Sequence, residues 1–592
     1  AVNQLGQQEK IDNDCGSASQ ESPAEEQQFV KYEGSLHTGT LEKWLKDDSK
    51  LKELVSAPIL VSTIDHLISA TEGVRGGKQL PAMLRLLTSD LVLDEPDDFD
   101  IADLHAVCRL MNWAGMLGTR VLLSSATLPP GLIQALFAAY LAGRKMWQAS
   151  CGINGRPVNI CCAWFDEKDA DATQIYDGPG FRDAHAKFVA RRAVMLAEKE
   201  RLHFGRVASV SSASGAIQDV TESVAQTVHT QMLKLHQAHR QRHESGKTVS
   251  LGLVRFANIN PLVAVTKALI VIPSPEDVCI HYCVYHSRHP LAVRSDIEKR
   301  LDRAFTRHNE LDFWNNEDIA DALHNRPESH HLFVVLGTSV IEVGRDWDAD
   351  WGIIEPSSMR SIIQFAGRIQ RHRRNVPTSE NLVILRSNIK SLQKKAPAFC
   401  KPGFETKEHL LNSHDICELI PIADYRTINA LPRILSANNA NKLAELEHSR
   451  LSAELMSSKS KHVVAAQWWR APLSWNGWMQ RQTPFRYSPL PEAVFFLHMD
   501  DEESEARFYS RTGDNERKAQ GNFRREEVRC ASGVVCWGVM DYQHVLLDLA
   551  EKQSCEIASV GEKFAEVRVP VSEEDAVDDW RYHPWLGVFR NM

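Results

Sequence analysis

Short apolar runs that end in polar residues recur in the first part of the chain, and they constrain its fold more than any other feature. The three runs and the polar residues that follow them are Ile59-Leu60-Val61 before Ser62-Thr63, Leu91-Val92-Leu93 before Asp94-Glu95, and Val121-Leu122-Leu123 before Ser124 to Thr127. Helical stretches at 101–116 and 132–142 alternate with them, which is typical of parallel βαβ units. An open α/β sheet places its ligand at the carboxyl ends of its strands, so we expect the site beside these polar residues.

A second α/β lobe is predicted further along. Residues 183–243 are charged and mostly helical, and five strand-like runs follow at 249–254, 278–285, 332–336, 351–354 and 382–385. After Lys394 the pattern changes to a helical stretch at 443–456, a tryptophan-rich section and a last apolar segment at 534–549. We therefore predict an α/β fold of two lobes, followed by a smaller mixed accessory C-terminal domain.

Composition excludes several classes of protein. No run of about 18 uncharged apolar residues is present, which argues against a membrane span. The 12 cysteines include no Cys-x-x-Cys pair, so a zinc ribbon or a disulfide scaffold is not indicated and a reducing cytoplasm fits best. The net charge of −9 does not exclude a nucleic-acid partner, because phosphate binding depends on local basic stripes. Ala1 in the place of methionine suggests processing or a fragment.

The first chemical signal is Asp94-Glu95-Pro96-Asp97 after an apolar strand. Phosphoryl transfer to water needs one carboxylate for Mg²⁺ and a second to orient the attacking water, and adjacent Asp94 and Glu95 supply both. The alternative is an acidic surface turn. One βα unit later, Ser125-Ala126-Thr127 offers two hydroxyls that can hydrogen-bond the acidic motif and couple it to the other lobe. The alternative there is a helix start capped by Thr127.

The second lobe carries two further patterns. In the run from Gly337 to Asp346, Thr338 at a strand end suits a backbone-phosphate contact, Gly344 allows close approach to nucleotide, and Asp346 can accept from the ribose or stabilise the loop. The alternative is a turn that leads into a helix cap.

The most specific pattern is Gln364-Phe365-Ala366-Gly367-Arg368-Ile369-Gln370-Arg371. If this run is helical, Arg368 and Arg371 share one face, and their guanidinium groups can pair with γ-phosphate oxygens. A solvated basic helix is the alternative, and the interleaved apolar residues weaken it.

Taken in order, these patterns resemble motifs II, III, V and VI of superfamily 2 helicases. The finer match of Leu-Asp-Glu-Pro-Asp-Asp-Phe-Asp, Tyr-His-Ser-Arg-His-Pro and Gln-Phe-Ala-Gly-Arg-Ile-Gln-Arg-His resembles the CRISPR-associated helicase–nuclease, particularly its type I-F form. The resemblance covers about residues 55–390. It implies two RecA-like lobes, the first incomplete: a lead-in at 1–57, lobe 1 at 58–160, lobe 2 at 161–395 and the accessory domain at 396–592.

The resemblance also implies a function. It implies ATP-dependent 3′-to-5′ translocation on single-stranded DNA, recruited in the bacterial cytoplasm by a Cascade-type surveillance complex and linked to an adaptation nuclease. Asp94 would hold Mg²⁺ and Glu95 would position water. ATP would also meet six further residues, Gln364, Gly344, Asp346, Asp97, Ser125 and Thr127. For the DNA strand we expect contacts from Ser62, Thr63, Thr338, His286 and Arg288.

The phosphate loop that the family needs is not found in the sequence. Gly246-Lys247-Thr248 lacks the upstream glycine and precedes a strand, Gly77-Lys78 lacks the hydroxyl residue, and His414-Asp415 has no matching nuclease residues upstream. We therefore expect the chain to be the carboxyl-terminal part of a larger enzyme, without a histidine–aspartate nuclease domain, and to hydrolyse little ATP by itself.

Three alternatives stay open. Cys279, His281, Cys283, His286 and His289 have metal-ligand chemistry, but alternation along one strand face explains the first three more simply. The tryptophans and basic residues at 468–487 fit either base stacking or a core. The whole chain is also compatible with a non-catalytic nucleic-acid or partner-binding module, or with an RNA helicase of the same superfamily.

Overall fold

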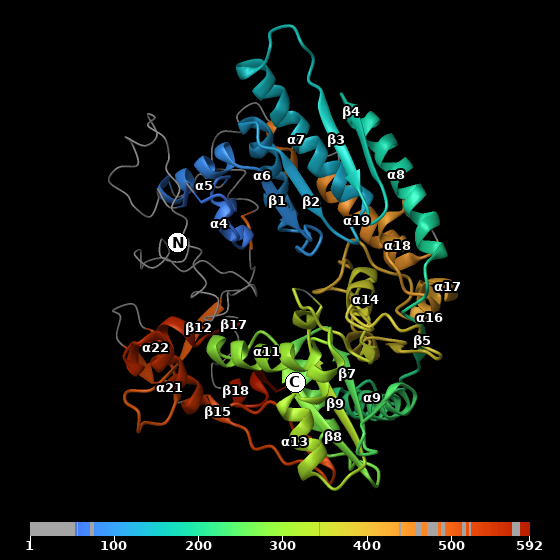
Figure 1. Cartoon of the computed structure of the whole chain (residues 1–592), viewed down its shortest axis with the longest axis vertical. Helices are drawn as coiled ribbons and strands as arrows, with labels where there is room; N and C mark the ends of the chain where they lie inside the picture. The colour runs from blue at the N-terminus through green and yellow to red at the C-terminus, as the bar shows by residue number, and fades with distance from the viewer. Residues whose placement is uncertain are drawn as a thin grey trace.

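The computed structural model describes residues 54–55, 57–71, 76–342, 344–436, 440–456, 465–470, 484–486, 492–511, 517–519, 523–570 and 580–591. Figure 1 shows a first lobe at the top, a second lobe below it, and the C-terminal helices and strands beside the second lobe. Helix α14 lies between the two lobes (Figure 1).

The first lobe is built on two short parallel strands. Its elements are α4 (Ile64–Ile68), α5 (Gly76–Thr88), β1 (Leu91–Asp94), α6 (Leu104–Leu117), β2 (Val121–Ser124) and α7 (Pro130–Cys151). Leu91 pairs with Val121 and Asp94 with Ser124, so the two strands end level with each other. Alternate strand residues pack against the helices, while Val92 and Leu122 on the other face are 59% and 50% exposed.

Two glycines let the helices of this lobe pack closely. A Cβ atom on Gly115 of α6 would lie 2.4 Å from the Tyr140 carbonyl oxygen, and one on Gly143 of α7 would lie 2.1 Å from that of Asn112. Any larger residue would push the helices apart, because both obstacles are backbone atoms. The position of β1 and β2 on these helices therefore depends on both glycines.

A connecting segment leads to the second lobe. It contains β3 (Ile160–Phe165) and β4 (Ala170–Ile175), which form an antiparallel hairpin, and then α8 (Gly178–Glu198), β5 (Gly205–Ala208) and α9 (Ile217–His239). Residues 183–243 were predicted to be mostly helical, and α8 and α9 make up most of that stretch. Strand β5 lies between the two helices and pairs with β11.

The second lobe contains an eight-stranded sheet in the order β16-β8-β9-β7-β10-β11-β5, with β6 paired to β7. Its elements are β6 (Gln241–Arg242), β7 (Thr248–Arg255), α10 (Ile259–Leu269), β8 (Val278–Tyr285), α11 (Leu291–Phe305), α12 (Glu310–Trp314), α13 (Glu317–Asn325), β9 (His330–Gly337), η2 (Ser339–Ile341), β10 (Trp351–Ile354), α14 (Met359–Ala366) and β11 (Leu382–Leu385). Apart from β6, neighbouring strands are parallel. Helices cover both faces, and β7 is therefore buried throughout.

The remaining elements divide between both lobes and a set of smaller sheets. They are α15 (Ile389–Leu392), α16 (Ile416–Leu419), α17 (Ile422–Arg426), α18 (Leu431–Ile434), α19 (Lys442–Met456), η3 (Ala465–Arg470), β12 (Glu492–His498), β13 (Arg507–Arg511), β14 (Arg517–Ala519), β15 (Arg524–Arg525), β16 (Val534–Cys536), α21 (Tyr542–Gln553), α22 (Ile557–Phe564), β17 (Glu566–Pro570), β18 (Trp580–His583) and β19 (Gly587–Arg590). Helix α19 packs against α7, and β16 adds to the edge of the large sheet beside β8.

The predicted α/β fold class is confirmed, with a large parallel sheet and a smaller C-terminal part that contains antiparallel strands. The five strands predicted in the second lobe are all present. The buried strand predicted at Ile59-Leu60-Val61 is wrong, because this segment belongs to no strand and Ile59 and Val61 are 79% and 87% exposed. Among the described helices, none combines the length and the apolar character that crossing a membrane requires.

Candidate active site

The acidic turn, residues 94–98, begins where β1 ends. Asp94, its last residue, is exposed, and Glu95 follows with a left-handed φ of 44° and donates its N–H to the Ser124 carbonyl oxygen at 2.7 Å. Burial, reinforced by the charges of Asp97 and Asp98, raises the pKa of Glu95 to about 7. Its Oε2 atom is buried and has no hydrogen-bond partner in the part of the chain that the structure describes. Glu95 can therefore exchange a proton near neutral pH.

Asp97 ties the acidic turn to the end of β2. Its two carboxylate oxygens accept hydrogen bonds from Ser125 Oγ at 2.6 Å and from Thr127 Oγ1 at 2.7 Å. Arg433 of α18 donates to the same carboxylate at 3.1 Å. Burial alone would raise the pKa of Asp97, but the Arg433 charge and the two hydroxyls hold it below its usual range. The hydrogen bonds predicted from Ser125 and Thr127 to the acidic motif are present, and they engage Asp97 within the protein.

Helix α14 of the second lobe is hydrogen-bonded directly to this turn. Arg360 donates to the carbonyl oxygens of Asp97 at 2.9 Å and Phe99 at 3.2 Å, and the Gln364 amide donates to the Asp98 carboxylate. Gln364 was predicted from its motif but Arg360 was not, although a spacing of four residues places both on one side of a helix. Arg433 links Asp97 to Glu447 of α19 and was not predicted either, because it carries no local signal in the sequence.

The two arginines of the glycine-containing motif do not lie on a helix, so the predicted helical face is wrong. Helix α14 ends at Ala366, and Gln370 has a left-handed φ of 52°, which takes Arg371 off the helical path. Arg368 donates from Nε to the Glu342 carbonyl oxygen at 2.9 Å. Burial and the nearby Arg371 lower the pKa of Arg368 to about 10, while Asp98 and Glu95 act in the opposite direction. Arg368 therefore lies within electrostatic reach of the acidic turn.

Arg371 is held by Asp346. The Nε atom of Arg371 donates to Asp346 Oδ1 at 2.8 Å, and the terminal guanidinium nitrogens bond no other described residue. His372 and His308 approach the same carboxylate at 3.0 and 3.2 Å. Hydrogen bonding by His372, together with Arg371, lowers the pKa of Asp346 to about 2. Asp346 thus orients Arg371 while leaving its outer nitrogens available.

The remaining predicted site residues lie in both lobes. Gly344 has a φ of +64° and no atom within 4 Å of the place where a Cβ would stand, so the backbone there is open. Thr338 follows β9, precedes η2 and is buried. Ser62 and Thr63 are half-buried just before α4 in the first lobe. Their contacts with a nucleic acid stay predictions.

His286 and Arg288 lie beneath the C-terminal strands. His286 is fully buried, with Nε2 2.8 Å from the Leu586 carbonyl oxygen. Arg288 donates to Asn260 Oδ1 at 2.9 Å and stands 5.0 Å from the centre of the Trp580 ring. Burial lowers the pKa of Arg288 to about 10. In this conformation, therefore, the protein itself covers the segment that was predicted to contact the DNA.

The segments that resemble part of a phosphate loop or of a nuclease motif have other roles in the structure. Gly246 lies in the turn between β6 and β7, and Gly77-Lys78 lies inside α5. His414 pairs with Glu405, and Asp415 caps α16. Of the tryptophans, Trp468 is buried and its ring centre lies 6.4 Å from that of Trp113, as a core residue would be. Trp475, Trp478 and Tyr487 lie outside the described residues.

Family models and curated proteins give concordant matches. The model described as CRISPR-associated nuclease/helicase Cas3, C-terminal, matches residues 248–374, and the model described as CRISPR-associated Cas3 subtype I-F/YPEST-like, C-terminal domain, matches residues 492–590. The CRISPR-associated nuclease/helicase Cas3 subtype I-F/YPEST of Pectobacterium atrosepticum is 48% identical over 97% of this chain and 53% of that protein. The protein of the same description from Pseudomonas aeruginosa is 41% identical over 98% of this chain and 54% of that protein.

Solved structures also match. The T. fusca Cas3–ATP structure has a TM-score of 0.49 and 14% identity, over 93% of this chain and 55% of that one. A structure titled CRISPR RNA-guided surveillance complex, pre-nicking, has a TM-score of 0.44 and 14% identity, over 93% of this chain and 63% of that one. The chain spans about half the length of the curated relatives that it matches. With 48% identity over nearly its whole length, the chain belongs to the CRISPR-associated Cas3 nuclease/helicase family, subtype I-F/YPEST.

Proposed function

We propose that the chain forms most of an ATP-driven 3′-to-5′ single-stranded DNA translocase of CRISPR interference, which acts with a nuclease to degrade invading DNA in the bacterial cytoplasm. The observation that carries the proposal is the direct connection between α14 and the acidic turn, through Gln364 with Asp98 and Arg360 with Asp97. The acidic turn of one lobe is therefore hydrogen-bonded directly to a helix of the other. Such a junction is suited to converting a change at a phosphate group into relative motion of two lobes.

The acidic turn fits a magnesium–nucleotide complex. Asp94 is exposed at the end of its strand, and the Oε2 atom of Glu95 has no hydrogen-bond partner within the described part of the chain. Asp94 and ATP would hold Mg²⁺, which when bound offsets the negative charge of the phosphates. Glu95 would orient the attacking water and take its proton. A pKa of about 7 suits that role, because general bases work best when their pKa lies near the working pH.

The arginines would act from the opposite side of the nucleotide. Asp346 holds Arg371 through Nε. The two terminal nitrogens of Arg371 can then bind two phosphate oxygens at the same time. Arg368 would break its hydrogen bonds with backbone carbonyl oxygens and turn toward the nucleotide, where it would contribute a second positive charge. Glu95 and Asp98 already attract it in that direction. Gly344 would let the backbone approach the nucleotide, and Asp97, Ser125 and Thr127 would transmit lobe movement rather than meet the phosphates.

A further segment would complete the first lobe. The sequence of 592 residues contains no Gly-x-x-x-x-Gly-Lys-Ser/Thr, so the amides and the lysine that cradle the phosphates must come from elsewhere. Exposed Val92 and Leu122 on one face of β1 and β2 support this, because parallel sheets are normally covered on both faces. The part of the relatives that this chain does not match would supply it.

The path of the DNA strand is proposed over both lobes. Hydroxyls of Ser62, Thr63 and Thr338 would bind backbone phosphates without reading sequence. His286 and Arg288 would join them only after residues 586–588 move, because these residues hydrogen-bond the same segment. A Cascade-type surveillance complex and an adaptation nuclease are proposed as partners on the basis of the family resemblance.

The test is DNA-stimulated ATP hydrolysis, measured for this chain alone and after combination with the unmatched part of the Pectobacterium atrosepticum relative. We expect low turnover from the chain alone. In combination, we expect turnover that single-stranded DNA stimulates and displacement of strands only from substrates with a 3′ single-stranded tail. Ordinary turnover by the chain alone, or a folded combination that hydrolyses ATP without moving on DNA, would overturn the proposal.

A further inference from the structure

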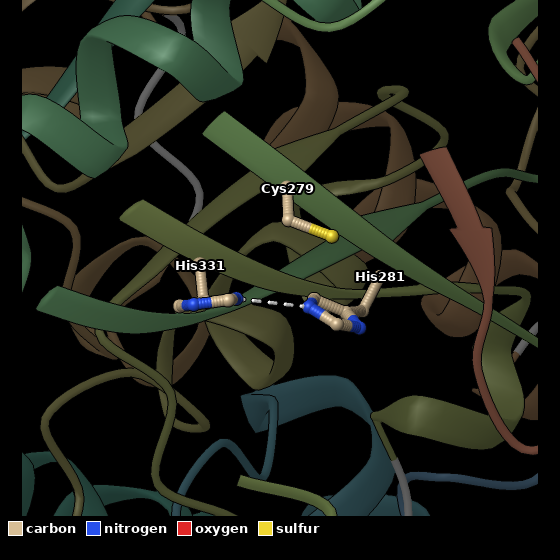
Figure 2. A group of neighbouring side chains, drawn as sticks. All are labelled: Cys279, His281 and His331. Atoms are coloured by element: carbon tan, nitrogen blue, oxygen red, sulfur yellow. Dashed lines mark hydrogen bonds between the residues drawn. The ribbon is translucent and has the colours of Figure 1, made fainter. Parts of the chain in front are cut away.

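Three metal-binding side chains converge in the second lobe, away from the candidate active site. Cys279 and His281 belong to β8, and His331 belongs to the neighbouring strand β9, where it lies opposite Cys279 in the parallel register. All three are buried, and one ligand atom from each lies within 4.8 Å of the others. Figure 2 shows the three side chains pointing into one region between the strands. Cys279 and His281 stand close together in the sequence, whereas His331 lies 50 residues beyond His281 and was not among the predicted candidates.

The separation of the two imidazoles matches a shared metal ion. His281 Nε2 and His331 Nδ1 share a hydrogen bond at 3.3 Å, so the two nitrogens already face each other. Two nitrogens that each lie about 2.0–2.1 Å from a tetrahedral zinc ion are about 3.3 Å from each other. Cysteine thiolates and histidine nitrogens bind zinc in preference to harder cations such as Mg²⁺, because the harder cations favour oxygen ligands. The ring of His281 is fixed in place by Phe333, which stacks on it with ring centres 4.2 Å apart.

An unsatisfied carboxylate oxygen lies near this group. Glu328 Oε2 is buried without a hydrogen-bond partner among the described residues, an arrangement that is costly unless another group compensates it. The Glu328 charge acts on both Cys279 and His331. A divalent ion held by one thiolate next to one carboxylate would leave no net charge in this buried region.

The position of the group indicates a structural role. Cys279 and His331 are each the second residue of their strand, whereas Tyr285 and Gly337 at the other ends of these strands lead toward the candidate active site. His281 also pairs with Val535 of β16, the strand that the C-terminal part adds to the sheet. An ion here would fasten β8 to β9 at the edge where β16 docks.

We propose that Cys279, His281 and His331 form a binding site for a zinc-class divalent transition metal, which stabilises the β16-β8-β9 edge of the second lobe. The site is independent of the proposed motor function, because none of its residues belongs to the nucleotide or DNA machinery described above. A chain that lacks ATPase activity would therefore still bind the metal.

The test uses the full chain, stripped with a chelator and titrated with Co²⁺, whose absorption reports thiolate coordination. We expect one equivalent to bind with a thiolate-to-metal band. Cys279→Ser and His331→Gln should each weaken binding by more than the roughly 10–100-fold that loss of a supporting outer-shell group costs. Cys283→Ser is the matched control, since Cys283 lies buried on the same strand outside the group, and it should bind normally.

A second measurement needs no variant. X-ray absorption of the zinc-loaded wild-type chain should show one sulfur at about 2.3 Å together with nitrogens at about 2.0–2.1 Å. Thermal unfolding of that chain should shift to lower temperature when zinc is removed and recover on its return. A thiolate band that survives Cys279→Ser, a zinc environment of oxygen and nitrogen only, or a stability indifferent to zinc would overturn the proposal.

Discussion

The guanidinium of Arg360 donates to the carbonyl oxygen of Asp97 at 2.9 Å, and this contact joins the second lobe to the acidic turn of the first. The same nitrogen also reaches the Phe99 carbonyl oxygen, so one side chain restrains two points in the chain that follows β1. Asp97 is in turn bonded to Ser125, Thr127 and Arg433. A displacement of α14 must therefore move the carboxylates, or break these bonds.

Arg360→Lys should uncouple the lobes, because the lysine side chain is shorter and its ammonium cannot take the position from which Arg360 Nη1 donates to both carbonyl oxygens. Hydrogen bonds from a charged group contribute about 1.5–3 kcal/mol, so we expect DNA-stimulated ATP turnover in the complete enzyme to fall by about 10-fold or more. Nucleotide affinity should change little. Arg120→Lys is the control, because Arg120 forms an exposed pair with Asp90. Equal turnover in the two variants would contradict a coupling role for Arg360.

Asp94→Ala should abolish ATP turnover in the complete enzyme and leave single-stranded DNA affinity nearly unchanged. The carboxylate serves the metal, whereas phosphate contacts elsewhere hold the strand. Asp90→Ala, one residue before the same strand, is the matched control and should keep its activity. Steady-state ATPase and fluorescence anisotropy on labelled DNA measure the two quantities. A parallel fall in both would remove Asp94 from the metal site.

Glu95 should make stability depend on pH in a predictable direction. Its pKa rises from 4.5 to about 7 in the folded chain, so its contribution to stability is fully present below pH 4.5 and is lost as the pH rises through 7. Glu95→Gln should remove this loss and unfold at a higher temperature than wild type at pH 8, with a smaller difference at pH 5. Because Glu95 is partly exposed, we expect a gain on the order of 1 kcal/mol at pH 8. Thermal melts across this pH range test it, and a Glu95→Gln variant that melts below wild type at pH 8 would refute the pKa shift.

The sequence predicted the parts of this structure that depend on neighbouring residues. The runs at β1, β2 and the five second-lobe strands combine β-branched residues with an abrupt polar end, and all of them are strands. The same reasoning failed at Ile59-Leu60-Val61, because apolar character alone does not supply a partner strand. It also failed at Arg368 and Arg371, where a left-handed Gln370 turns the chain off the helix.

Contacts between residues that are far apart in the sequence could not be predicted from local sequence patterns. Arg433 reaches Asp97 across more than three hundred residues, and nothing in its surroundings distinguishes it from a surface arginine. His331 joins Cys279 and His281 only because β8 and β9 are adjacent in the sheet order. The order of the strands and the packing of the lobes therefore determine both the lobe junction and the proposed metal site. Neither arrangement can be read from a single sequence.

Arg371 provides the sharpest test of mechanism. Its Nε is held by Asp346, and its terminal nitrogens bond no other described residue, so its fork is positioned before any nucleotide arrives. If it acts on the γ-phosphate only when the lobes close, it stabilises the transition state more than the bound substrate. Arg371→Lys in the complete enzyme should then lower turnover by about 10²-fold or more, with a much smaller change in nucleotide affinity.

Arg386→Lys is the control for that experiment, because Arg386 also pairs with a single aspartate, Asp415, at the surface. It should keep normal turnover. Asp346→Asn offers an independent check, since it weakens the grip on Nε while Arg371 itself remains. It should reduce turnover less than Arg371→Lys does, because a loosened guanidinium still reaches the phosphate part of the time. Near-normal ATPase in a stable Arg371→Lys variant would mean that Arg371 only stabilises its loop through Asp346.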